Sequence, residues 1–192
     1  MMKQLWLTVL VVTTGCTMPL SKELPAEHFY QLNLTDATQI APLQIKTTAS
    51  GLGLGTQAIM AIREFEVLPI SNAYWIEEPD DLLRKSLQRY SLINADPQLP
   101  VQQINIDIID MHFYQADGED YIQLTLNTQG DVEWLFSETM TVDTAEVKTV
   151  VAGFNTLLTQ YVQALAGRTQ IKADSTFGLT TSDSTDDMTQ TE

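Results

Sequence analysis

The sequence predicts one α/β domain of the α+β kind, in which two main helices cover a mixed, mostly antiparallel sheet. Its length supports a single domain, because 192 residues are enough for one sizeable core and not clearly enough for two. Its composition supports a packed fold, since 44% of the residues are apolar. Its patterning supports the class, because short alternating segments precede a long segment of helical spacing.

A processing signal is expected at the amino terminus. The apolar run LWLTVLVV at 5–12 is too short to span a bilayer, which takes about 20 residues, and it is typical of a signal peptide. Thr13, Thr14 and Gly15 then lead into Cys16. These four residues resemble the bacterial lipobox. A plain secretory signal, or a buried first strand with an incidental cysteine, is the alternative interpretation.

The lipobox resemblance implies that residues 1–15 are removed and that Cys16 becomes the acylated first residue, carrying palmitate-type chains. Two or more such chains anchor a protein stably in a membrane. Residues 16–25 are then a tether. By the same resemblance, Thr17 in place of Asp favours the outer membrane of a Gram-negative bacterium, facing the periplasm. Thr13 departs from the leucine that is usual at its position.

Two strands and a loop region are expected before residue 70. Aromatic and branched residues predict a first strand at 26–34. Residues 35–56 are rich in Thr, Ala, Ser and Gly, and they predict a loop with a short strand at 43–46. The apolar segment 58–67 predicts a second, central strand that Pro69 ends.

A helix is expected at 79–93. Pro79 suits the first helical position, and acidic residues follow it at the positive end of the helix dipole. Leu83, Leu87 and Tyr90 fall on one face of this helix, which is therefore the face that should meet the core.

Three alternating segments follow the helix, at 101–115, 121–127 and 132–140. The turn between the first two, at 116–120, is built on an Asp-Gly pair, which favours a hairpin. The three segments therefore predict an antiparallel meander.

The last element predicted is a long helix at 143–166, where apolar residues recur at helical spacing and Gly167 is a plausible end. The domain is expected to span 26–167. Residues 168–192 hold few large apolar side chains, so they predict an acidic disordered tail.

Charge and cysteine content exclude several functions. The net charge of −15 disfavours binding of nucleic acid, which needs a Lys/Arg surface. One cysteine cannot form an internal disulfide, and one cysteine with two histidines disfavours a zinc site. We therefore expect no nucleic-acid partner, no metal and no cofactor.

Two motifs invite an enzymatic interpretation. The glycines of SGLGLG at 50–55 suggest a phosphate loop, but such a loop needs a following helix and usually a Lys, and here an apolar strand follows. A flexible loop is favoured. Asp110 and His112 share a strand face and could pair in acid–base catalysis. Because no nucleophile motif accompanies them, a structural histidine is favoured and a hydrolase remains the alternative.

Two further groups have both a functional and a structural interpretation. The carboxylates at 77, 78, 80 and 81 could hold a divalent cation, although a solvated helix start explains them better. Tyr74 and Trp75 could contact a partner or lipid, although an aromatic pair beside a helix is more often core. No catalytic constellation remains, so the sequence predicts a protein that is not an enzyme.

The order of parts resembles that of the ABC-type transport auxiliary lipoproteins, the PqiC/YmbA-like group. After the lipobox, Phe29-Tyr30-Gln31-Leu32 corresponds to an aromatic first strand and Phe65-Glu66-Val67-Leu68-Pro69 to a strand ending in Val-x-Pro. A Trp before a Pro-initiated helix, a meander and a long helix complete the similarity, which covers about residues 5–167. The short stretch 70–74 and the acidic tail depart from the family pattern.

The resemblance implies a non-enzymatic lipoprotein subunit of an ABC/MCE-type intermembrane lipid transport system, docking the transport conduit at the outer membrane. Its partners would be an MCE-domain protein and ABC transporter components, and ring-like self-association into a homo-oligomer would suit a docking collar. The alternative is an assembly or activator lipoprotein, similar to a pilotin, of another cell-envelope complex.

Overall fold

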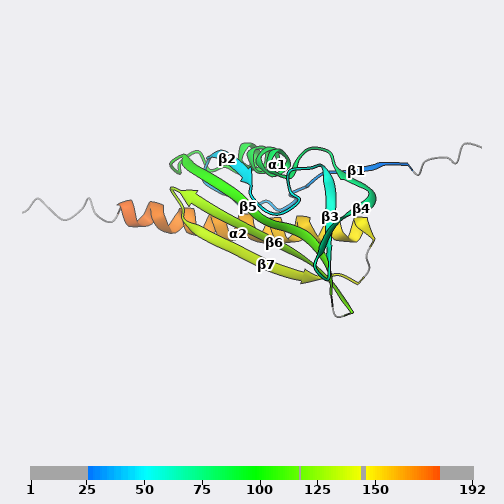
Figure 1. Cartoon of the computed structure of the whole chain (residues 1–192). Helices are drawn as coiled ribbons and strands as arrows, with labels where there is room; N and C mark the ends of the chain where they lie inside the picture. The colour runs from blue at the N-terminus through cyan, green and yellow to red at the C-terminus, as the bar shows by residue number, and fades with distance from the viewer. Residues whose placement is uncertain (1–25, 117, 144–145, 178–192) are drawn as a thin grey trace, which may run out of the picture.

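The computed structural model describes residues 26–116, 118–143 and 146–177. The predicted signal peptide, the tether up to residue 25 and residues 178–192 of the predicted tail lie outside the described residues, and so do the lipobox and Cys16. The described residues form seven strands and two helices (Figure 1). They are β1 (His28–Tyr30), β2 (Leu43–Ala49), β3 (Ala58–Arg63), β4 (Glu66–Trp75), α1 (Pro79–Asn94), β5 (Gln102–Ala116), β6 (Glu119–Gly130), β7 (Trp134–Thr141) and α2 (Val147–Phe177).

All seven strands belong to one open, mixed sheet. Its order is β1-β4-β3-β5-β6-β7, and β2 also pairs with β5. The pairs β1–β4, β2–β5 and β3–β5 are parallel, whereas β3–β4, β5–β6 and β6–β7 are antiparallel. The predicted fold class and the predicted meander are confirmed.

Strand β5 changes partner along one edge. Residues 102–108 pair with β2 and residues 113–115 pair with β3, both in parallel. The ladder to β6 is irregular between these two stretches, around Ile109. The loop 50–57 leaves the sheet here, where the N–H groups of Ser50 and Gly51 both donate to the Ile108 carbonyl at 3.1 Å.

Both helices cover the same face of the sheet. A small core cavity brings together Leu83 of α1, Phe154 and Leu158 of α2, and Ile108 and Leu124 of the sheet. Helix α2 runs along β5, β6 and β7, and α1 lies over β2 (Figure 1). The apolar stripe of each helix is thus buried by one shared core, as its sequence spacing predicts.

The predicted second strand is in fact a hairpin. The segment 58–67 turns at Glu64 and Phe65, and β4 then continues through Pro69 to Trp75. The turn carries no Gly, Asn or Pro, the residues that usually mark one. Instead Glu64 itself adopts the left-handed conformation at φ 55°, which a sequence pattern does not reveal.

The ends of two other elements also differ from prediction. The first strand is limited to β1, because only three residues pair with β4. Helix α2 does not end at Gly167 and continues to Phe177. The turn after Gly167 stays attached to the domain, since Arg168 lies 4.5 Å from the centre of the Trp134 ring and Thr169 is buried.

Candidate binding groove

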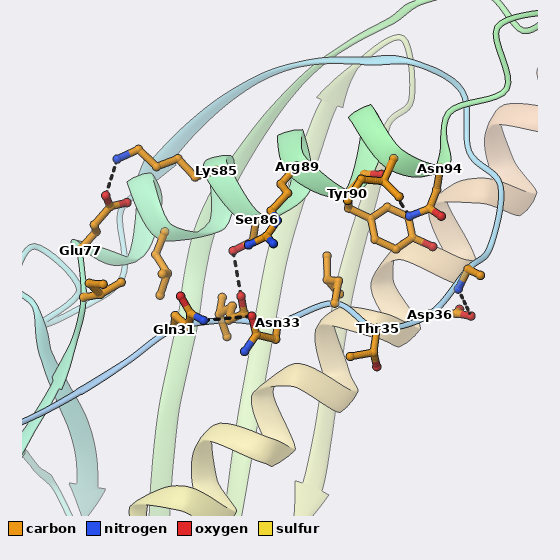
Figure 2. Close-up of a pocket in the computed structure, with 16 residues that line it drawn as sticks. Gln31, Asn33, Thr35, Asp36, Glu77, Lys85, Ser86, Arg89, Tyr90 and Asn94 are labelled. Atoms are coloured by element: carbon orange, nitrogen blue, oxygen red, sulfur yellow. Dashed lines mark hydrogen bonds and ion pairs between the residues drawn. The ribbon is translucent and has the colours of Figure 1, made fainter.

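An open groove of about 670 Å³ lies between α1 and the extended segment 31–37 (Figure 2). The segment follows β1 and joins no sheet ladder. Helix α1 lines the groove with side chains from one of its faces. Ile76 and Glu77, which follow β4, also line it. The helical residues are Leu82, Lys85, Ser86, Arg89, Tyr90, Ile93 and Asn94. The volume is in the range of small-molecule and peptide sites.

The segment wall is held in place by helix α2. The Asn33 N–H donates to the Asn155 side-chain oxygen at 2.8 Å, and the Gln163 side chain donates to Asp36 at 2.7 Å. Leu32 attaches the same segment to the core, because its side chain is buried among residues of both helices. The segment is therefore fixed although it has no strand partner.

Hydrogen bonding also sets the charge state of Asp36, which lines the groove. The Thr38 hydroxyl donates to Asp36 at 2.6 Å, and this bond, followed by the one from Gln163, holds the pKa of Asp36 below its usual value. Burial raises the pKa of Tyr90, whose hydroxyl donates to the Thr38 carbonyl at 2.8 Å. Asp36 is therefore a stable anion beside a neutral phenol.

The helix wall carries two cations with different surroundings. Lys85 forms an ion pair with Glu77, and both side chains line the groove. Arg89 is exposed and makes no hydrogen bond or ion pair with any residue that the structure describes. In a chain of net charge −15, this leaves an available guanidinium beside apolar Ile93, which is 71% exposed. Such a surface fits a ligand with an anionic group and an apolar part.

Asp110 and His112 do meet, on the outer face of β5. The His112 Nδ1 atom lies 2.7 Å from Asp110, and the Tyr114 hydroxyl donates to the other Asp110 oxygen at 2.5 Å. The His112 Nε2 atom is 2.7 Å from the Leu52 carbonyl, which can only accept, so Nε2 is the donor. Both ring nitrogens are thus engaged, and neither is free to take a proton from a nucleophile. The geometry supports the structural interpretation of this histidine.

This cluster pins the glycine-rich loop to the sheet. Besides the bond from His112 to Leu52, Ser50 donates to Asp107 from its hydroxyl at 2.6 Å. A Cβ atom at Gly51 would lie 2.2 Å from the Ile109 carbonyl, so only glycine fits there. The loop is followed by β3, as predicted, and Gly51 serves this close approach of two backbones. Burial, followed by the bond to Asp110, raises the pKa of Tyr114 at the end of the cluster.

The structure does not bring the remaining predicted site residues together in one site. Trp75 is 1% exposed and packs edge-on against Phe154, so it belongs to the core, as the structural alternative has it. Tyr74 is half-buried, and its ring lies 5.8 Å from that of Phe29. Of the predicted carboxylate cluster, residue 77 pairs with Lys85 and residue 81 with Arg84.

Two general features of the described residues bear on function. Within residues 26–116, 118–143 and 146–177, no three His, Cys, Asp or Glu side chains gather as a metal site would require. Over those same ranges, no helix is long and apolar enough to cross a membrane.

Comparison with known proteins rests on the fold. No family model matches the sequence, and no curated protein matches it. The crystal structure of a Xanthomonas campestris protein of the DUF330 family matches with a TM-score of 0.57 and 17% identity, covering 80% of this chain and 98% of that chain. The two chains share a fold. A second crystal structure, of an uncharacterized protein, matches with a TM-score of 0.45 and 17% identity, covering 79% of this chain and 99% of that one.

Sequence patterns did not predict the groove. Its two walls are about 50 residues apart in the chain, and the alternation of segment 31–37 resembles that of an ordinary strand. The one available signal was the spacing of Lys85 and Arg89, which places both cations on one side of α1.

Proposed function

We propose that the protein is a lipid-anchored, non-enzymatic subunit of an ABC/MCE-type intermembrane lipid transport system. It sits on the periplasmic face of the outer membrane and docks the transport conduit there. The observation that carries the proposal is the order of parts: a lipobox-like sequence at 13–16 and a predicted tether, then an aromatic first strand, a helix begun by Pro79, a meander and a long last helix.

Two structural findings support this proposal. The fold is shared with a DUF330 protein, and the PqiC/YmbA-like group is the DUF330 family. The Asp110–His112 pair, the strongest catalytic candidate, has both ring nitrogens engaged within the fold. A tethered domain with a groove, whose Asp110–His112 pair is engaged within the fold, suits docking better than hydrolysis.

Affinity isolation from detergent-solubilised envelope tests the proposal. The full chain, tagged at its carboxyl terminus, should recover an MCE-domain protein or an ABC transporter component after mild cross-linking. The same protein with Cys16→Ser, which removes the anchor, should recover much less of it. Clean recovery of a secretion or cell-wall complex, with neither of these components, would show instead that the chain assists another envelope machine.

A further inference from the structure

The segment 31–36 has the properties of an unoccupied sheet edge. Its side chains alternate between exposed and more buried positions, as in a strand. The backbone N–H and C=O groups of Leu34 and Asp36, which share the α1-facing edge of the segment with Leu32, have no hydrogen-bond partner within the described part of the chain. Both residues line the groove, and Figure 2 labels Asp36 among the lining residues.

This edge is also organised in advance. Asn155 and Gln163 of α2 hold it at Asn33 and Asp36, so it does not have to be ordered when a ligand arrives. An extended polypeptide can add to such an edge through main-chain hydrogen bonds. A hydrocarbon chain could not satisfy these backbone groups, and covering them with it would cost free energy.

The opposite wall selects the charge of the added strand. Lys85 is already paired with Glu77, whereas Arg89 has no ionic partner among the described residues. A guanidinium in this position is suited to a carboxylate, which it can bind through two parallel hydrogen bonds. The helix wall therefore favours an extended polypeptide that places a carboxylate on Arg89, whereas the segment wall itself carries the Asp36 anion.

We propose that residues 178–192 of this chain are that polypeptide, adding to segment 31–36 with a carboxylate on Arg89. The segment contains no Lys or Arg, and its carboxylates are Asp183, Asp186, Asp187 and Glu192. Charge complementarity thus favours it over residues 1–25, which carry Lys3 and Lys22. The groove is then a strand-binding site that the chain's own tail occupies.

Chain length permits this return. Helix α2 passes the groove at Gln163 and ends at Phe177, roughly 20 Å further on at 1.5 Å per residue. Residues 178–192 in extended form span roughly 50 Å, which covers the way back and a stretch along the groove. A segment attached in this manner has an effective concentration on the order of millimolar, so even a weak contact is populated. The inference does not depend on the transport role.

Amide hydrogen exchange in the full chain tests the proposal. In the wild type, the amides of Leu34 and Asp36 should exchange about twofold or more slowly than in a variant with Asp183→Asn, Asp186→Asn and Asp187→Asn, the factor expected when effective concentration equals Kd. Arg89→Glu should remove the same protection, and so should high salt. Combining Arg89→Glu with Asp186→Lys and Asp187→Lys should restore it.

Arg84→Glu is the matched control, because Arg84 lies on the same helix and does not line the groove. It should leave the exchange of Leu34 and Asp36 unchanged. Equal exchange in all variants, or equal loss in Arg84→Glu, would overturn the proposal. Protection that grows with protein concentration would also overturn it, because the bound strand would then come from a second copy.

Discussion

At the scale of single residues, Tyr161 and Thr128 form a hydroxyl pair inside the core. The two oxygens lie 2.9 Å apart, and both side chains are buried. Tyr161→Phe leaves the Thr128 hydroxyl without this partner, so we expect a loss of about 1–2 kcal/mol in the free energy of unfolding. Urea unfolding measures it. Tyr74→Phe, at a half-buried ring, should cost much less, and equal losses would contradict the assignment.

Tyr161 should also make the stability of the fold depend on pH in the alkaline range. Burial raises the pKa of Tyr161 above its usual value near 10. The folded state therefore keeps a proton that the unfolded state releases, and the stabilisation, complete below about pH 10, is lost as the pH rises further. We expect the melting temperature of the wild type to fall with pH in this range more steeply than that of Tyr161→Phe. Parallel curves would exclude Tyr161 as the cause.

Sequence patterns predicted local structure well where the residue types of a short stretch determine it. Pro79 marked the start of α1, and the glycine-rich loop was correctly separated from phosphate loops by the strand that follows it. The patterns could not show that His112 bonds to Leu52, because that contact joins residues 60 positions apart across the β5 irregularity.

At the scale of elements, the junction between the loop 50–57 and β5 depends on one glycine. In Gly51→Ala the new methyl group would meet the Ile109 carbonyl, so loop and strand must separate. We expect a loss of about 2 kcal/mol in the free energy of unfolding, typical of overpacking. Gly55→Ala is the control, because a Cβ there meets nothing within 4 Å. Thermal unfolding of both variants decides, and equal stability would contradict this role of Gly51.

The elements themselves were predictable to different degrees. The meander and both helices followed from periodicity, because each buries one regular face. The β3–β4 hairpin did not, since its turn depends on the backbone angle of Glu64. The extension of α2 did not either, because the turn after Gly167 is held by contacts of Arg168 and Thr169 with the rest of the fold. The groove was not predictable either, because one of its walls is a segment that alternates like a strand and yet pairs with no strand.

At the scale of the whole molecule, the proposed attachment to a membrane depends on Cys16. We expect the mature native protein to begin at Cys16, to carry acyl chains and to fractionate with membranes. Cys16→Ser should remove the added mass and release the protein, because a net charge of −15 opposes adsorption to anionic lipid. Intact-mass analysis of both proteins measures this. An unmodified Cys16 in the native protein would remove the anchor from the proposed function.

The three-residue ladder between β1 and β4 has a mechanical consequence for a protein held by its amino terminus. Any tension along residues 16–25 is applied first to β1, whose parallel pairing with β4 covers only His28 to Tyr30. After β1, the force acts on segment 31–37, which Asn33 and Asp36 attach to α2 by one hydrogen bond each. Segment 31–37 would therefore bear the force directly after β1. We expect tension to loosen this wall of the groove before it disturbs the core.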